Sequence, residues 1–319
     1  MRVISITKTH KGEEFAIASL ESIYNYMYKI VYVHSNINWL GEKSANTVAP
    51  LIEAWKKEHD RDNKIINLYL DTKSQEEQYG HGLQYIHMNF HYDFKMFIDT
   101  DEVWENSMLI RALATLDPQG TANAYRCNMY SYIKSPFFRT QEFDTLCPVV
   151  FVKTGSGYQG VRGCKTQPET MLPSVHFHHF CAVRKSLRDV LQKHKTSCGT
   201  ESVAMVDSAE WVREKWNKLP TAMDLLPIKN HEHQWHAIKV VQLTELPETC
   251  RDLPIVQAFQ KALPFSRKLK LDKHPQVPWP SKLPLDFDES HALYKTPSYK
   301  NTYQRYLHDL AEAHAGATK

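Results

Sequence analysis

The sequence lacks any run of 18 or more apolar residues, so no segment has the length and apolarity of a membrane-spanning helix. The N-terminus lacks the apolar core and cleavage site of a signal peptide. The six cysteines are dispersed and include no Cys-x-x-Cys pair, which argues against a disulfide framework and against a cysteine-based zinc site. We therefore expect reduced thiols and a cytoplasmic protein.

The sequence also lacks a strong excess of positive or negative charge. The formal net charge is +3 and the isoelectric point is near 8.4, a balance that neither requires nor excludes a nucleic-acid partner. There is no Gly-x-Gly-x-x-Gly sequence and no Walker lysine loop, which weighs against the common NAD-binding and P-loop motifs. With 42% hydrophobic and 24% charged residues, the composition is that of a globular protein.

Apolar runs of strand length alternate with helix-periodic segments over the first 100 residues. The predicted strands are residues 3–7, 30–33, 65–70 and 94–98, and the predicted helices are residues 15–27, 46–59 and 75–90. A helix over 107–116 and strands over 124–133 and 149–153 follow. This order predicts an α/β fold with a parallel sheet, whose ligands bind beyond the carboxyl ends of the strands.

Polar residues follow each of the first four predicted strands. Thr9, His34, Asp71 and the Asp99-Thr100-Asp101 sequence stand at these ends, so we expect them to line one rim of the sheet. In an extended chain Asp99 and Asp101 would point to the same side, about 7 Å apart at the backbone. Carboxylates in such a pair suit Mg²⁺ or Mn²⁺.

Three histidines fall within four residues further along the chain. His176 and His178 would share one face of a strand and His179 the other, so only some of them can reach a metal held by the carboxylates. Imidazole beside a strand end is a suitable additional ligand. A second histidine group, at 231, 233 and 236, lacks an accompanying cysteine pair or His-Glu-x-x-His motif and is better explained as the start of a surface helix.

Residues beyond about 200 differ in character from those before. Beyond Cys250 the chain becomes rich in proline and carries a basic run from Arg267 to Lys273. We expect a catalytic domain over residues 1–200 and, over 201–319, an extension with helices and an extended, proline-rich basic arm.

The chain resembles GT-A glycosyltransferases, most nearly those of family 2. The resemblance rests on a first strand followed by the Lys-Gly-Glu-Glu start of a helix, on Phe-Ile-Asp-Thr-Asp-Glu at 97–102, which matches the family's Asp-x-Asp motif, and on residues 179–184, similar to a His-Tyr-Gly-x-Val-Arg segment. It covers about residues 1–200. It implies a GT-A, Rossmann-like sheet flanked by helices and transfer of a sugar from a nucleotide-sugar to an acceptor hydroxyl.

The resemblance also implies roles for particular residues. Asp101 would bind Mn²⁺ or Mg²⁺, Asp99 would lie near the ribose or the metal, and His179 or a neighbour (His176 or His178) would complete the ligand set. The ion would neutralise the departing diphosphate as a Lewis acid. Thr7, Thr9, His34 and Asp71 fall where the family binds the nucleoside. A UDP-sugar is the favoured donor, although His34-Ser35-Asn36 replaces the aspartate with which many members bind uracil.

The general base and the acceptor stay open. An inverting enzyme needs a carboxylate near the acceptor hydroxyl, and Asp144, Glu142 and Glu169 are the candidates, whereas a retaining enzyme needs none of this kind. The acceptor is a glycan, a small molecule, a protein or a hydroxylated DNA base, the last because the basic segments 184–195 and 267–273 could contact phosphates. The sequence calls for no obligatory protein partner. The alternatives are a sugar nucleotidyltransferase and a non-catalytic module that binds nucleotide-sugars or nucleic acid.

Overall fold

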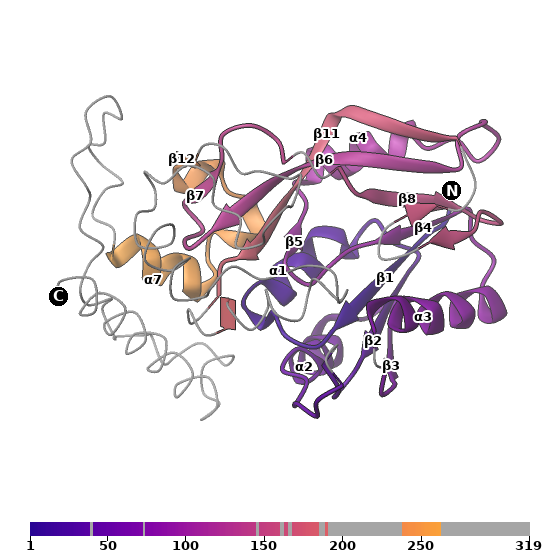
Figure 1. Ribbon diagram of the computed structural model, residues 1–319, viewed down its shortest axis with the longest axis horizontal. Coiled ribbons are helices and arrows are strands. Elements are labelled where there is room, and N and C mark those ends of the chain that lie inside the picture. The colour runs from indigo at the N-terminus through magenta and orange to yellow at the C-terminus, as the bar shows by residue number, and fades with distance from the viewer. Residues whose placement is uncertain are drawn as a thin grey trace. The chain divides into compact units, whose positions relative to one another are not determined.

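The protein is described here from a computed structural model, shown as a ribbon in Figure 1. The structure describes residues 1–38, 41–72, 74–144, 147–159, 163–164, 168–184, 189–190 and 238–262. The chain forms two compact units: Met1–Tyr130 with Thr145–His179, and Ser131–Asp144 with Phe180–Lys319. The chain passes from one unit to the other at residues 130–131, 144–145 and 179–180. The domain boundary that we expected near residue 200 lies outside the described residues.

Four parallel strands form one half of the sheet of the first unit. They are β1 (Val3–Thr9), β2 (Lys29–His34), β3 (Ile65–Tyr69) and β4 (Phe94–Phe97), in the order β4-β1-β2-β3. The helices between them are α1 (Glu13–Tyr24), α2 (Ala49–His59) and α3 (Gln75–Asn89). The predicted strands and helices of this region are thus confirmed to within a few residues.

The other half of the sheet is antiparallel. Strand β8 (Val149–Lys153) pairs with β4 and with β6 (Ala124–Ile133), and β11 (Glu169–Ala182) pairs with β6 and with the short β5 (Glu102–Val103). A hairpin of β9 (Tyr158–Gln159) and β10 (Gly163–Cys164) and the helix α4 (Asn106–Thr115) complete the unit. The α/β class is confirmed. The sheet is mixed, because β8 pairs antiparallel with β4 and β6, and β11 pairs antiparallel with β5.

Helices cover both faces of this sheet. The alternating side chains of β1 show why: Val3 packs with Leu20 of α1 and Ile52 of α2, whereas Ile4 packs with Ile86 of α3. Helix α3 approaches especially closely, because Gly82 places its backbone against Ile6 and Val33. The strand ends are therefore fixed by packing on both sides.

The second unit is described only in part. Its strand β7 (Phe138–Thr140) pairs with the end of β6 and with β12 (Ile238–Val240), and two short 3-10 helices, Leu243–Glu245 and Glu248–Cys250, precede α7 (Pro254–Ala262). The extended arm that we expected beyond Cys250 begins instead with a helix, because proline is tolerated at a first helical position, where no N–H is needed.

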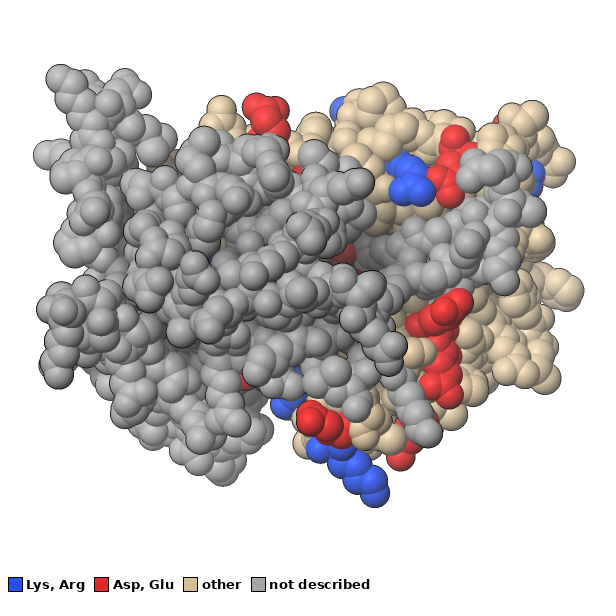
Figure 2. Space-filling view, viewed as in Figure 1, with Lys and Arg blue, Asp and Glu red and all other residues tan. Residues whose placement is uncertain are grey.

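The rest of the predicted extension lies outside the described residues. The residues of the extension outside the description include the histidines at 231, 233 and 236 and residues 267–273. The basic segment 184–195, which precedes the extension, is also outside it apart from Arg184, Asp189 and Val190. On the face seen in Figure 2, acidic and basic side chains of the described residues lie beside one another at the lower edge and at the upper right. Among the described helices, none is long and apolar enough to cross a membrane.

Candidate metal and nucleotide site

The Asp99–Glu102 segment is a tight turn. The Glu102 N–H donates to the Asp99 carbonyl (3.1 Å), and the Asp99 N–H donates to the Glu102 carboxylate (3.1 Å). This pair of bonds turns the chain from β4 into β5. The expectation of an extended Asp-Thr-Asp with both carboxylates on one side is therefore wrong, because a turn sends successive side chains in different directions.

The Asp99 carboxylate is directed at β1 and α3. It forms an ion pair with the Lys8 ammonium and accepts a hydrogen bond from the Tyr79 hydroxyl at 3.1 Å. The Lys8 side chain is 5% exposed and that of Asp99 25%. The Lys8 ammonium also lies 4.9 Å from the centroid of the Tyr79 ring. Asp99 thus belongs to a lysine–carboxylate–tyrosine group at the strand end.

The Asp101 carboxylate lies against a histidine from the distant strand β11. The antiparallel pairing of β5 with β11 sets Glu102 opposite His179, and this brings Nε2 of His179 to 3.6 Å from Oδ1 of Asp101. The side chain of Asp101 is 4% exposed and that of His179 18%. Nδ1 of His179 is buried and has no hydrogen-bond partner within the part of the chain that the structure describes. A carboxylate oxygen and an imidazole nitrogen converge here in a largely buried place.

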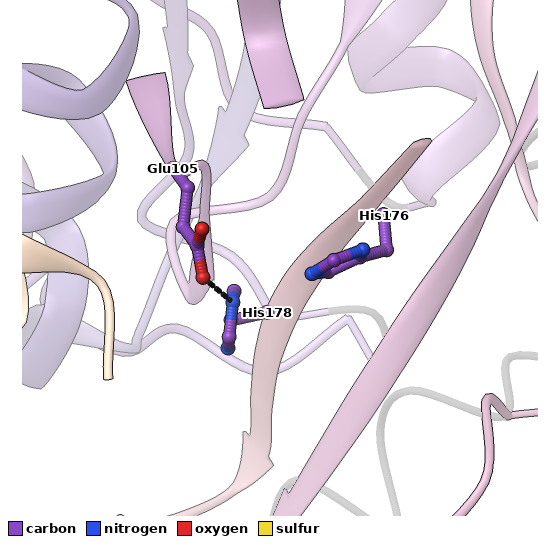
Figure 3. A group of neighbouring side chains, drawn as sticks. All are labelled: Glu105, His176 and His178. Atoms are coloured by element: carbon purple, nitrogen blue, oxygen red, sulfur yellow. Dashed lines mark hydrogen bonds and ion pairs between the residues drawn. The ribbon is translucent and has the colours of Figure 1, made fainter. Parts of the chain in front are cut away.

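The other two predicted histidine ligands lie elsewhere. Because side chains alternate along a strand, His176 and His178 leave β11 on the face opposite His179. Nε2 of His178 lies 3.0 Å from Oε1 of Glu105, the residue before α4 (Figure 3). The expectation that His176 or His178 shares a metal with Asp101 is therefore not supported by the geometry.

Two of the residues expected at the nucleoside, Thr9 and His34, belong to a hydrogen-bond network at the carboxyl ends of β1 and β2. Thr9 accepts from the Asn46 amide (3.0 Å) and lies 2.6 Å from Nδ1 of His34, whose Nε2 lies 3.1 Å from the Asn67 amide oxygen. The Asn67 amide nitrogen in turn donates to Glu53 at 2.7 Å. These roles fix the tautomer: Nε2 carries the proton, and Nδ1 accepts from Thr9.

Burial lowers the pKa of His34, and the ring stacks against Tyr32 and Tyr69. Both of its nitrogens are bonded within the protein, so His34 shapes the strand end and has no ring nitrogen left for a base. Thr7 lies within β1, and its buried hydroxyl has no partner among the described residues. Asp71 lies just beyond β3 and is exposed.

One of the three general-base candidates, Glu169, belongs to the same unit as Asp101 and lies far from His179 along the chain. Glu169 starts β11, ten residues before His179, which is about 30 Å along an extended strand, and it pairs with Arg126. Asp144 and Glu142 belong to the second unit, where Asp144 is buried and accepts from the Ser131 hydroxyl at 2.6 Å and Glu142 is exposed.

Tyr79 and Glu105 were not among the residues that the sequence singled out. Tyr79 occupies an apolar position of a helix, and nothing in the sequence indicates that its hydroxyl contacts Asp99. Glu105 stands just before the helix that starts at Asn106, and an acidic residue at such a position is ordinarily explained by the helix dipole.

Comparison with known proteins gives only remote similarities. No protein-family model matches the chain, and no curated protein matches it. Among solved structures, S. aureus TarS is 14% identical over 58% of this chain with a TM-score of 0.39, and S. aureus TarS 1-349 in complex with UDP is 15% identical over 48% with a TM-score of 0.34. The 4-diphosphocytidyl-2C-methyl-D-erythritol synthase from Anaerococcus prevotii is 10% identical over 61% with a TM-score of 0.36.

The alignments cover 37% and 47% of these two TarS chains and 95% of the synthase. These two alignments thus cover less than half of either TarS chain, whereas an alignment with another structure of S. aureus TarS 1-349 covers 92% of that chain and 99% of this one, at 14% identity and a TM-score of 0.39. At these scores the likenesses identify neither a family nor an activity. The functional argument rests on the site itself.

Proposed function

We propose that this chain is a metal-dependent glycosyltransferase that uses a nucleotide-sugar donor and binds Mn²⁺ or Mg²⁺ through Asp101 and His179. The observation that carries the proposal is the approach of His179 to Asp101, across 78 positions of sequence, at the end of a strand of the sheet. Ligands of open α/β sheets bind at such strand ends. The Asp-Thr-Asp-Glu motif and its resemblance to family 2 glycosyltransferases agree with this position.

The residues present suit a divalent cation. The Asp101 carboxylate is 4% exposed and lies 3.6 Å from an imidazole nitrogen, and both are groups that bind divalent cations. An oxygen ligand from the Asp99–Glu102 turn and a nitrogen ligand from β11 leave further coordination positions open, as Mn²⁺ and Mg²⁺ require when they also bind phosphates. When bound, the cation supplies Lewis-acid stabilisation of the nucleoside diphosphate that leaves the sugar.

The surrounding residues have separate tasks in this proposal. Lys8 and Asp99 form a buried ion pair that is neutral overall, and this pair holds the start of the Asp99–Glu102 turn against the end of β1. The Thr9–His34–Asn67 chain of hydrogen bonds holds the neighbouring strand ends in place beside the nucleoside. The Asp99–Glu102 turn fixes the direction of the Asp101 carboxylate. These residues bind or orient the donor. The acceptor supplies the hydroxyl that receives the sugar.

The test combines binding and product analysis. Nucleotide-sugars are screened for thermal stabilisation of the protein with Mn²⁺ or Mg²⁺, and donor turnover is followed by chromatography. We expect one nucleotide-sugar to stabilise the wild type and to release a nucleoside diphosphate. Asp101→Asn and EDTA should abolish both effects. Asp62→Asn, which changes an exposed aspartate between α2 and β3, should retain them.

Other results would contradict the proposal. Pyrophosphate release with a nucleoside triphosphate as substrate would identify a nucleotidyltransferase. Stabilisation without turnover across a panel of glycan, small-molecule and hydroxylated-DNA acceptors would favour a binding module. A donor effect that survives in Asp101→Asn would remove the carboxylate from the site.

A further inference from the structure

Glu105, His176 and His178 form a second group of potential metal ligands, separate from Asp101. One ligand atom from each lies within 4.8 Å of the other two. In Figure 3, Glu105 and His178 point toward one another, and His176 projects from the same strand beside them. His178 is buried, and Glu105 and His176 are half-buried.

Backbone geometry keeps this group apart from the Asp101 site. His176 and His178 are two residues apart in β11 and share a face, whereas His179 leaves the opposite face. The ring of Tyr130 lies 5.2 Å from that of His176 and 6.0 Å from that of His178, and the two histidine rings lie 5.7 Å apart. One strand therefore presents two sets of imidazoles to two different places.

The donor set is that of a transition-metal site. Two imidazole nitrogens and one carboxylate oxygen are ligands that Zn²⁺ accepts, with a fourth position open to water. Ligand atoms around a tetrahedral Zn²⁺ are about 3.4 Å apart. The ligand atoms of this group lie within 4.8 Å of one another, so closing the group requires a movement of at most about 1.4 Å. His176 and Glu105, which would make this movement, are only half-buried.

We propose that Glu105, His176 and His178 bind a second divalent cation of the Zn²⁺ class. The ion would tie β11 to the residue that precedes α4, and so hold the register in which His179 faces Asp101. The proposal does not rest on the glycosyltransferase activity. With the Asp101 site, it would place a metal on each face of β11. The ligands are Glu105, His176 and His178 on one face and Asp101 and His179 on the other.

The test uses the full chain, stripped of metal with a chelator and then loaded with Zn²⁺ or with Co²⁺ as a spectroscopic substitute. Metal is counted by mass spectrometry, and the visible absorption of Co²⁺ reports nitrogen ligation. We expect His176→Ala to bind one equivalent less than the wild type and to lose that absorption. Glu105→Gln should do the same. Circular dichroism checks that the variants are folded.

Two controls separate this site from others. Asp101→Asn should keep the equivalent that His176→Ala loses. His59→Ala should also keep it, since His59 is an exposed histidine 3.6 Å from the Glu58 carboxylate. Equal metal content in the wild type and His176→Ala would overturn the proposal, as would loss of the same equivalent in Asp101→Asn.

Discussion

At the scale of single residues, the ion pair with Lys8 engages the first aspartate of the Asp-x-Asp motif, Asp99. The Lys8 side chain is almost fully buried, so removing either partner strands a charge in a place of low polarity. We expect a double-mutant cycle of Lys8→Met and Asp99→Asn to give a coupling free energy of about 1–3 kcal/mol in urea unfolding. The Lys64–Asp62 pair, at 3.8 Å and with an exposed aspartate, should give less than about 1 kcal/mol. Equal couplings would mean that burial does not strengthen the Lys8–Asp99 contact.

His34 makes stability depend on pH. Burial lowers its pKa in the folded state below the ordinary value of 6.5, so from that value downward the unfolded chain binds a proton that the folded chain does not. The stability that neutral His34 contributes is complete above pH 6.5 and is lost as pH falls below it, with a slope of at most about 1.4 kcal/mol per pH unit.

The comparison that isolates this effect is the free energy of unfolding of wild type and His34→Gln between about pH 7.5 and pH 5. The variant should be less stable at the higher pH and should lose less stability on acidification. His10, whose pKa is also lowered by burial, remains in both proteins and cancels. His59→Gln, at an exposed position, should follow the wild type, and a parallel pH dependence in His34→Gln would contradict the assignment.

At the scale of elements, α3 offers a matched pair of glycines. A Cβ at Gly82 would meet Ile6 at 2.8 Å and Val33 at 3.0 Å, whereas a Cβ at Gly80 would meet nothing within 4 Å. Gly82→Ala should therefore destabilise the protein by about 1–3 kcal/mol through overpacking against the sheet. Gly80→Ala should stabilise it by about 0.5–1 kcal/mol through helix propensity. Denaturant unfolding measures both, and effects of the same sign would show that α3 does not pack tightly on β1 and β2.

The elements that the sequence predicted are those with a strong local pattern. Strands β1 to β4 are apolar runs and α1 to α3 have helical periodicity, so neighbouring residues alone specify them. Strand β5 has two residues and β7 has three, too few for any periodicity. These short strands exist because distant strands pair with them, and that information is not local.

The same reasoning explains what was predicted of the site. Asp99, Asp101 and His179 could be named from residue type and position beside strand ends. The turn at Asp99–Glu102 could not, because Asp-Thr-Asp-Glu is compatible with both an extended and a turned backbone. The separation of His179 from His176 and His178 followed from strand alternation, but the partner on each face, Asp101 or Glu105, depended on the pairing of β5 with β11.

At the scale of the whole molecule, the proposed cation at Asp101 would link segments that are far apart in the sequence. Asp101 and His179 lie 78 positions apart, so a metal that binds both recognises only the folded first unit. A ligand that binds only the folded state at 100 times its dissociation constant adds about 2.7 kcal/mol. For a unit of this size that corresponds to a rise in Tm of roughly 5–10 °C.

Calorimetry with increasing Mn²⁺ measures this rise. Wild type and His176→Ala should both respond, since the latter leaves Asp101 and His179 intact, and EDTA should reverse the effect. Asp101→Asn should not respond, because its amide cannot provide the negative charge that holds the ion. An undiminished rise in Asp101→Asn would place the Mn²⁺ elsewhere in the chain, whereas a rise lost only in His176→Ala would assign it to the Glu105 group. The two variants therefore decide which face of β11 holds the ion that stabilises the molecule.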